Sequence, residues 1–285
     1  MKGKVVTPQP YSAGGALASA GPGPEELEKL LIEHRGLLDR YRVLKHGLNR
    51  AGRVQRGLLP ARPPTVDGYR FTHFYQPCEE VGGDFYDFVA SEDRLVVIVS
   101  DVVGHGFEAA LTTMLIKEIF EEAAVDTPEP VELLLRMNRR LHRVLPEGMY
   151  AAAVVLTLSF ASAKLELGSA GLPYPFVLRA RERLVEQIDL AGFPLGLFAE
   201  VPTPFEERSV SLLPGDVLLV GSDGIQTVAG SHGDFFEDER LPRLLSDLVG
   251  HSGEDIIQRL ADETLRFGNG EPLPDDLNLL AITRE

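Results

Sequence analysis

Four aspartates stand beside apolar runs, at places where a carboxylate needs a partner. Asp101 and Asp223 each follow an apolar run that closes in Ser-Asp. Asp84 stands within the sequence VGGDFYD, and Asp275 comes just before the apolar run over residues 279–282. An ionised carboxylate at the edge of a core needs an opposite charge or several hydrogen bonds, and these motifs contain no Lys or Arg. Divalent cations are therefore the expected partners.

The donor set predicts which cations these are and what they would do. Oxygen ligands alone favour hard ions, Mg²⁺ or Mn²⁺, over zinc. Two such ions held about 3.5–4 Å apart by shared carboxylates lower the pKa of a bridging water and neutralise a phosphoryl group, which is the chemistry of phosphomonoester hydrolysis. Taken singly, each motif is more typical of a turn or a helix cap, and Asp223 with Gly224 is also compatible with a tight turn. The prediction rests on four such motifs in one chain.

Two glycine-containing segments accompany the aspartates. Gly104, His105 and Gly106 precede a predicted helix, and two alternatives are open for them. Either the glycines adopt positive φ while His105 caps or packs locally, which is the more common case, or His105 acts directly as a general acid. Gly82 and Gly83 permit close approach of the backbone to an ion or a phosphate, or they form a bulge.

Cys78 is the rival nucleophile, and its surroundings argue against that role. Glu79 and Glu80 follow it and are expected to raise the pKa of the thiol, and no Arg lies between it and Asp84 to hold a phosphate. As the single cysteine, it excludes an intramolecular disulfide and a cysteine-built zinc site, and it suits a reducing cytoplasm. A glycine-rich phosphate loop ending in Gly-Lys-Ser/Thr is absent, which excludes nucleotide hydrolysis by that route.

The composition excludes several other classes of function. The chain has 285 residues, with 28 Lys and Arg against 43 Asp and Glu, and a formal net charge of -15. This charge repels phosphate backbones and anionic bilayers, so we expect no nucleic-acid partner and no membrane partner. No run reaches the roughly 18–20 apolar residues of a membrane span, and the N-terminus lacks the apolar centre of a secretory signal. We expect a cytoplasmic protein.

Short apolar runs predict strands, and the patterns between them predict helices. The expected strands cover residues 70–75, 95–100, 151–160, 164–169, 176–180, 217–221 and 279–282. The expected helices cover about 107–124, 130–145, 238–249 and 253–267. The last helix has Ser252 and Asp255 in capping-box spacing and Gly268 just past its end. Because the helices fall in two clusters and do not alternate with the strands, we predict antiparallel sheets with segregated helices.

The N-terminal segments differ from the rest. Residues 1–23 are poor in large side chains and predict a flexible tail. Residues 24–58 predict one helix, closed by Pro60 and marked by a heptad seam that the polar His34 and Gln55 complete. The apolar seam positions are Leu27, Leu30, Leu37, Tyr41, Leu44, Leu48, Ala51 and Leu58. Two alternatives are open: a helix packed on its own domain, or a dimerising coiled coil that transmits a signal and uses the polar positions to select register.

Taken in order, these motifs resemble the metal-dependent protein serine/threonine phosphatases of the protein phosphatase 2C (PP2C) family, in its bacterial branch typified by the stage II sporulation protein E phosphatase domain. The matching pieces are VGGDFYD at 81–87, SDVVGHGFEAAL at 100–111, GSAGLPYP at 168–175, FPLGLF at 193–198, LLPGDVLLVGSDGI at 212–225 and PDDLNLLAI at 274–282. The resemblance covers about residues 55–283. It implies an α+β fold, an α-β-β-α sandwich of two antiparallel sheets, with the catalytic domain over 60–285 behind a helical linker over 24–59.

The resemblance also implies a set of metal ligands at one end of the sandwich. Asp101 would bridge two Mn²⁺ or Mg²⁺ ions, with Asp84 and the Val102 carbonyl on the second ion. Asp223 and Asp275 would bind the first ion. Asp275 is expected in place of Asp276, because the metal-binding aspartate of the family is the first residue of its Asp-Asp/Asn-x-Thr motif.

Asp84 and Asp101 are the expected catalytic residues. The residues expected to support the set are Gly83, Gly104, His105, Asp276 and Asn278. The chain departs from the family pattern at three places: Asn278 replaces the usual threonine, no glutamate follows Asp223-Gly224 where Gln226 stands, and Leu172 replaces a frequent histidine. None of these departures removes an expected ligand.

The resemblance implies direct attack of a metal-bridged hydroxide on phosphoserine or phosphothreonine, without a phosphoenzyme. The expected substrate is a phosphorylated bacterial regulatory protein, and the resemblance suggests an anti-sigma-factor antagonist. The alternative is a catalytically weak signalling module of the same fold that binds a partner through its N-terminal helix. A homodimer through residues 24–58 is compatible with both. The four retained carboxylates favour the enzyme, because they are unfavourable without a use.

Overall fold

The structure is a computed structural model that describes residues 23–230 and 233–285. Nearly all of the flexible tail predicted over residues 1–23 lies outside the described residues. Within them, no helix is long and apolar enough to cross a membrane.

Two antiparallel sheets, each of five strands in the described part of the chain, form the centre of the molecule. The first sheet has the order β1 (Tyr69–Gln76), β10 (Leu277–Arg284), β9 (Val217–Gly221), β6 (Phe176–Arg179) and β7 (Leu184–Gln187). The second has the order β2 (Phe85–Ala90), β3 (Arg94–Val102), β4 (Ala151–Ser159), β5 (Leu165–Ala170) and β8 (Glu207–Val210). Segments from both ends of the catalytic region therefore meet as neighbours in the first sheet.

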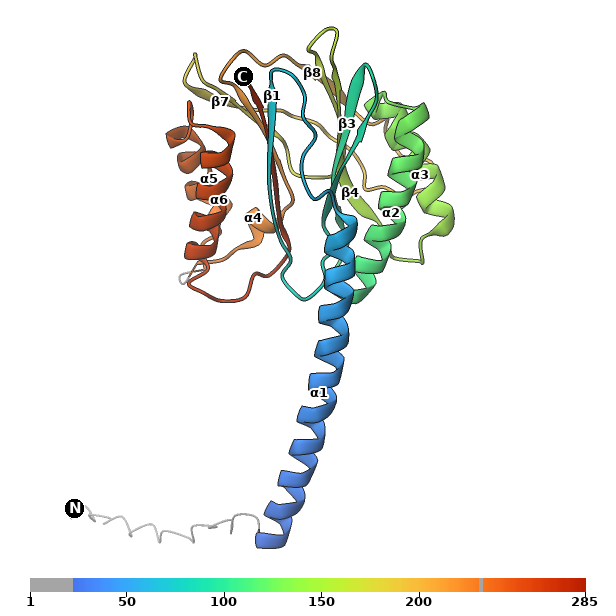
Figure 1. Cartoon of the computed structure of the whole chain (residues 1–285), viewed down its shortest axis with the longest axis vertical. Helices are drawn as coiled ribbons and strands as arrows, with labels where there is room; N and C mark the ends of the chain where they lie inside the picture. Colours follow the sequence, from blue (N-terminus) through green and yellow to red (C-terminus); the bar gives the residue numbers. More distant parts are fainter. Residues whose placement is uncertain (1–22, 231–232) are drawn as a thin grey trace, which may run out of the picture. The chain divides into compact units, whose positions relative to one another are not determined.

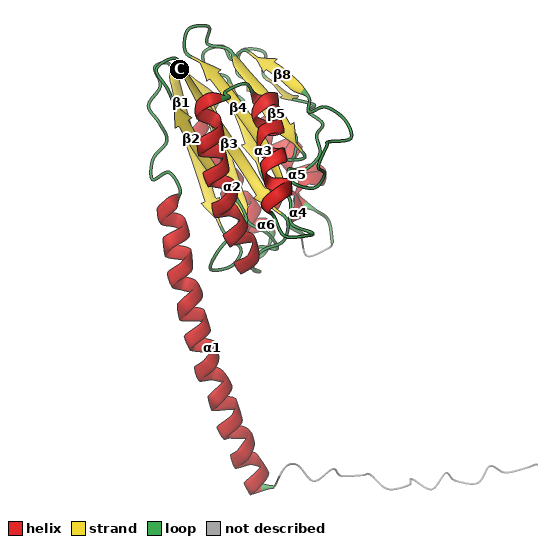
Figure 2. Cartoon of the chain, turned by 90° about the vertical axis from the view of Figure 1, so that its right-hand side faces the viewer, coloured by secondary structure: helices red, strands yellow, loops and turns green. Residues whose placement is uncertain are grey.

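Helices cover the outer face of each sheet. The helices α2 (Phe107–Asp126) and α3 (Pro130–Val144) lie on the second sheet, and α5 (Phe236–Asp247) and α6 (Gly253–Phe267) lie on the first (Figure 1). Figure 2 shows α2 and α3 side by side across the strands of the second sheet. The layers follow the order helix, sheet, sheet, helix, which confirms the predicted α-β-β-α class.

The core explains why the sequence shows continuous apolar runs and few alternating ones. Val96 and Val97 of β3 point to opposite faces of their sheet, yet each is about 1 % exposed. One face of this sheet packs against helices and the other against the first sheet, so both must be apolar. Leu156 of β4 and Leu218 of β9 belong to the same cluster, which joins the two sheets. This packing holds the strand ends that carry the aspartates.

The structure contains elements that the sequence patterns did not predict. The strands β7 and β8 are short and mostly exposed, so they lack an apolar run. The strand β2 follows directly on the glycines of VGGDFYD, which obscure its start. The one-turn helix α4 (Gly224–Thr227) begins where a tight turn was an alternative. The predicted cap of α6 is confirmed, because the Asp255 N–H donates to Ser252 Oγ at 3.1 Å.

The helix α1 (Pro24–Leu58) precedes the sandwich, as predicted. Residue contacts divide the chain into two units, Met1–His46 and Gly47–Glu285, and α1 spans the division. The domain boundary after residue 59 stays a prediction. Apolar seam positions of α1 are exposed, among them Leu37 at 63 % and Leu44 at 68 %.

Gln55 corrects one expectation about the seam of α1. The sequence places it where it would select register between two helices. In the structure its side chain is buried and bonds within its own chain: Nε2 donates to the Gly82 carbonyl at 2.6 Å, and the Gly82 N–H donates to Oε1 at 3.1 Å. Gln55 therefore joins the last turn of α1 to residues 77–84, between β1 and β2, which we name the Asp84 loop. Its polar side chain is explained by this bond.

Candidate active site

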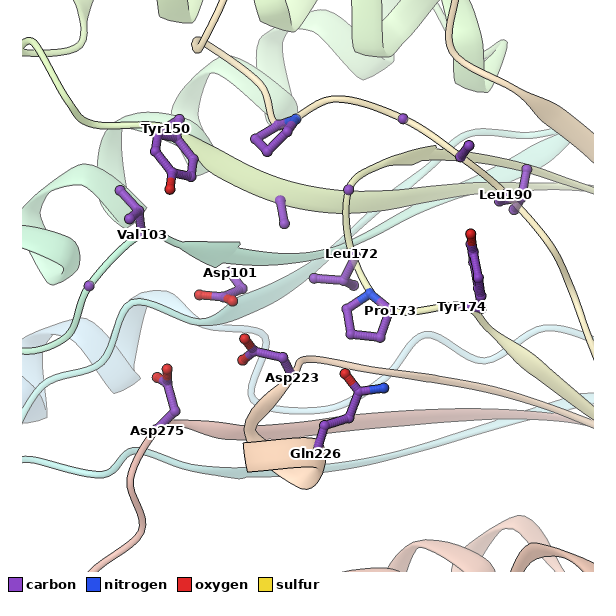
Figure 3. A pocket seen from close by; sticks show the side chains of 16 residues that line it. Asp101, Val103, Tyr150, Leu172, Pro173, Tyr174, Leu190, Asp223, Gln226 and Asp275 are labelled. Atoms are coloured by element: carbon purple, nitrogen blue, oxygen red, sulfur yellow. The ribbon is translucent and has the colours of Figure 1, made fainter. Parts of the chain in front are cut away.

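Three of the predicted aspartates line one cavity of about 720 Å³ (Figure 3). Asp101 comes from the end of β3, Asp223 from the residues after β9, and Asp275 from the residues before β10. Because β9 and β10 pair in antiparallel fashion, with Gly221 opposite Leu279, the end of one strand and the start of the other lie at the same edge. The fold thus brings together residues that are far apart in the sequence.

Asp84 belongs to the same acidic cluster, although it does not line the cavity. It is about 1 % exposed. Its carboxyl group is a hydrogen-bonding neighbour of Asp101 and of Ser222. Its Oδ2 atom is buried and has no hydrogen-bond partner among the described residues. A buried carboxylate oxygen without a donor is unfavourable unless a cation compensates it, which is the property expected of a metal ligand.

Burial and mutual repulsion raise the pKa values of all four carboxyl groups. At Asp101, burial is the largest cause, followed by the charges of Asp223 and Asp275, and together they raise the pKa to about 7. Burial, followed by the charge of Asp101, raises the pKa of Asp84 well above its usual value. Burial also raises the pKa values of Asp223 and Asp275. In the described part of the chain, no Lys or Arg lines the cavity. This set of oxygen donors fits Mg²⁺ or Mn²⁺.

Asp275 and Asp276 are adjacent but have different surroundings. Asp276 accepts two backbone hydrogen bonds, from the Cys78 N–H to Oδ1 at 2.8 Å and from the Asp84 N–H to Oδ2 at 3.1 Å. Asp275 lines the cavity. Both oxygens of Asp276 therefore hold the Asp84 loop, whereas Asp275 faces the other aspartates. This difference supports Asp275 as the ligand and Asp276 as the residue that positions the loop.

The two glycines before Asp84 allow the loop to pack closely against its neighbours. A Cβ at Gly82 would lie 2.2 Å from Tyr75 Oη and 2.3 Å from an Asp276 oxygen. A Cβ at Gly83 would lie 3.0 Å from the carbonyl oxygen of Val102, the expected backbone ligand. Close approach is therefore required, and the atoms approached belong to the protein itself.

The loop with His105 has the backbone that the sequence predicts. Gly104 and Gly106 have φ values of 82° and 76°, in the left-handed region that favours glycine. His105 Nδ1 lies 3.0 Å from Glu79 Oε1, and both side chains are largely exposed. Gly104 lines the cavity, whereas His105 does not. These contacts support a local role for His105, and its role as a general acid stays a prediction.

Asn278 and Cys78 have roles that their contacts explain. Asn278 Nδ2 donates to the Phe85 carbonyl at 3.0 Å, which links β10 in the first sheet to β2 in the second.

Burial, followed by the charge of Asp276 and a hydrogen bond with it, raises the pKa of Cys78 to about 12. The thiolate is therefore scarce at neutral pH, and Cys78 does not line the cavity. Both observations support the prediction that Cys78 is not the nucleophile.

Much of the cavity wall was not predicted. Beside the aspartates it contains Tyr150, Leu172, Tyr174, Leu190 and Gln226 (Figure 3). Two of these residues stood out in the sequence only as departures from the family pattern. The others have no spacing or chemistry that marks them, because they come from separate loops that meet only in the fold. The segments GSAGLPYP and FPLGLF were the local signals near them.

Comparison with known proteins shows the family to which the chain belongs. The profile of the family described as Stage II sporulation protein E (SpoIIE) matches residues 91–285, more than half of the chain. The chain belongs to this family of PP2C-type domains and is a protein phosphatase. The phosphoserine phosphatase RsbU of Bacillus subtilis (strain 168) is 22 % identical over 253 residues, which are 89 % of this chain and 74 % of RsbU. The phosphoserine phosphatase RsbP of the same organism is 26 % identical over 192 residues, 66 % of this chain and 47 % of RsbP. The chain thus spans about half the length of RsbP.

Solved structures share the fold. The SiaA-PP2C domain of Pseudomonas aeruginosa superimposes with a TM-score of 0.76 at 21 % identity, covering 86 % of this chain and 99 % of that domain. A structure of the PP2C phosphatase domain of SpoIIE from Bacillus subtilis with a fragment of its regulatory domain gives a TM-score of 0.64 at 18 % identity, covering 75 % and 63 %. The structure of the RsbU and RsbW domains of Rv1364c from Mycobacterium tuberculosis gives a TM-score of 0.65 at 30 % identity. The match covers 78 % of this chain and 61 % of that chain.

The raised pKa of Asp101 predicts how the metal-free protein responds to pH. A carboxyl group whose pKa is higher in the folded than in the unfolded protein lowers the stability of the fold once the pH exceeds its pKa in the unfolded protein, about 3.9. The penalty is complete above the folded value of about 7. Asp101→Asn should therefore raise the stability of the metal-free protein by at least about 1 kcal/mol more at about pH 8 than at about pH 5.

Thermal melts in the presence of a chelator measure this difference. The exposed Asp247, whose substitution by Asn should change the melting temperature little at either pH, serves as the control. An equal change in the stability of the metal-free protein by Asp101→Asn at both pH values would contradict the repulsion described above.

Proposed function

We propose that this protein phosphatase is metal-dependent and hydrolyses phosphoserine or phosphothreonine on a bacterial regulatory protein, with an anti-sigma-factor antagonist as the leading candidate. The observation that carries the proposal is the cluster of four carboxyl groups around a cavity that no cationic side chain lines among the described residues. RsbU and RsbP, which are named phosphoserine phosphatases, support the same class of substrate.

We assign Asp84, Asp101, Asp223 and Asp275, with the Val102 carbonyl, as the residues that would hold two Mn²⁺ or Mg²⁺ ions. Bound there, such ions supply positive charge to a phosphoryl group and lower the pKa of water. The orphaned Oδ2 of Asp84 supports this assignment most directly.

The residues of the cavity also indicate which nucleophile is used. Among the described residues, no Ser, Thr, Cys or His lines the cavity. The Cys78 thiol is outside it, and burial with the charge of Asp276 raises its pKa to about 12. The aspartates that line the cavity are assigned to the ions and not to the phosphorus. We therefore propose that water attacks the phosphorus atom directly, that the bond from phosphorus to the seryl or threonyl oxygen breaks to give inorganic phosphate and the free hydroxyl group, and that no phosphoenzyme forms. The carboxylates would hold the ions and balance their positive charge, and the uncharged wall would orient the substrate.

Loss of one carboxylate should remove most of the activity. With Mn²⁺, the wild-type chain should hydrolyse a generic aryl phosphate and a phosphoserine peptide, and a chelator should abolish both reactions. Asp101→Asn should lower kcat/KM by at least about 100-fold, because it removes a charge that holds the cations. Asp247→Asn is the matched control and should retain the wild-type rate. Equal and negligible rates for the wild type with and without Mn²⁺ would instead support the weak signalling module.

We further propose that the exposed seam of α1 forms a homodimer with a second copy of the chain. Leu44 on the seam and Val43 beside it are 68 % and 72 % exposed, so the structure offers a matched pair of apolar residues. A heptad seam buries its apolar residues only when another helix covers it. This proposal leaves the catalytic assignment unchanged.

The pair provides the test for dimerisation. Leu44→Lys should shift the mass measured by analytical ultracentrifugation from two chains to one, because it places charge in the seam. Val43→Lys should leave the mass of two chains, because Val43 lies off the seam. A single-chain mass for the wild-type protein would contradict the proposal.

The bond between Gln55 and Gly82 gives α1 a physical connection to the Asp84 loop. Gln55→Ala should free this loop and raise the Mn²⁺ concentration for half-maximal activity about 10-fold or more, as is typical when a residue that positions a ligand is lost. The Mn²⁺-dependent rise in melting temperature should shrink in parallel. Arg53→Ala, at an exposed position of the same turn, is the control. Unchanged metal dependence of Gln55→Ala would exclude the connection.

A further inference from the structure

The cavity beside the aspartates has two chemically different ends. Figure 3 shows the aspartates on one side and Leu172, Pro173, Tyr174 and Leu190 on the other, with Gln226 below Pro173. Its volume of about 720 Å³ lies within the range of roughly 300–1,000 Å³ that is typical of ligand pockets. A phosphoryl group occupies only the acidic end. The remaining space is therefore available to the part of the substrate that carries the phosphate.

Backbone and side-chain bonds hold the wall of the cavity in place. Ala151 and Leu195 exchange both backbone hydrogen bonds, at 3.0 and 2.7 Å. The buried Asn138 of α3 accepts from the Gly196 N–H at 2.8 Å and donates to the Phe198 carbonyl at 3.0 Å. These bonds hold the loop that supplies part of the apolar end. A preformed wall loses little entropy when a ligand binds, which favours selective binding.

The apolar end is suited to one kind of side chain. Leu172 and Leu190 are 3 % and 1 % exposed and belong to the core behind the wall, so they keep this end apolar but offer little surface, whereas Tyr174 is 42 % exposed and offers its ring to a ligand. A leucine-sized or aromatic side chain covered by these residues gains from the removal of apolar surface, about 25 cal/mol per Å². An acidic side chain would lose hydration at this end and would find no cationic side chain in the wall to compensate it.

We propose that the apolar end is a specificity subsite for an apolar side chain within three residues of the phosphorylated residue. Gln226, which lines the cavity below Pro173, hydrogen-bonds to the backbone of the substrate, since its amide both donates and accepts. An extended substrate advances about 3.3 Å per residue, so the cavity holds the phosphorylated residue and a near neighbour. This inference rests on the proposed function and narrows its substrates to phosphorylated segments with an apolar flanking residue.

Phosphoserine peptides test the subsite through kinetics. A set of peptides carries Leu, Ala or Asp at each of the three positions on either side of the phosphoserine. With Mn²⁺, the wild type should prefer Leu over Ala by about 10-fold in kcat/KM at one position, with Asp the poorest. Tyr174→Ala should reduce this preference to about 2-fold. Phe160→Ala, which removes an exposed aromatic side chain that does not line the cavity, should retain the wild-type preference.

Fluorescence provides a second measurement that does not depend on turnover. The chain contains no tryptophan, so a peptide with Trp at the preferred position and a phosphonate in place of the phosphate reports its own binding. With Mg²⁺, its emission should shift to shorter wavelength on the wild type and on Phe160→Ala. On Tyr174→Ala the Kd should rise about 5-fold or more.

The outcomes separate the subsite from the proposed function. If the wild type hydrolyses the peptides but shows no preference for Leu at any position, or if Tyr174→Ala keeps the preference, the subsite is wrong and the phosphatase assignment stands. If the wild type hydrolyses no phosphopeptide with either Mn²⁺ or Mg²⁺, the proposed function fails and the subsite fails with it.

Discussion

Repulsion among carboxylates that are largely withdrawn from water is the interaction on which this structure depends. Burial and the neighbouring acids raise the pKa values of Asp84 and Asp101, and no Lys or Arg lines the cavity in the described part of the chain. Near neutral pH, such a cluster is favourable only when cations neutralise it. The apolar core of the two sheets and their helices holds the cluster together. The stability of this core offsets the repulsion among the carboxylates.

The loops around the cluster show how its geometry is maintained. The Asp84 loop has no regular secondary structure, yet both oxygens of Asp276 accept its backbone N–H groups, and Gln55 bonds to Gly82 on its other side. A movement of the last turn of α1 would therefore act on the backbone that carries Asp84. The connection is a pair of hydrogen bonds to one peptide segment, which makes it sensitive to small displacements of the helix.

The neutral wall of the cavity complements the acidic end. Cations recognise any phosphoryl group, so they do not distinguish one phosphoprotein from another. Discrimination has to come from groups that touch the rest of the substrate. The remaining wall consists of apolar or uncharged side chains on several loops, one of which is held by Asn138 and by the pairing of Ala151 with Leu195. Loops of this kind vary freely among proteins that share a core, because they contribute little to folding.

Local patterns in the sequence were enough for the main strands, for five of the helices and for marking the aspartates, because apolar runs, caps and Ser-Asp strand ends are formed by neighbouring residues. The sequence patterns did not predict the short exposed strands β7 and β8, because these strands depend on pairing with neighbouring strands. The different roles of Asp275 and Asp276 and the use of Gln55 within its own chain were decided by contacts between distant segments. Residue types and their order therefore specify the class and the chemistry of this chain. The packing of the two sheets against each other decides which carboxylate oxygens face one another and which loops form the wall of the cavity.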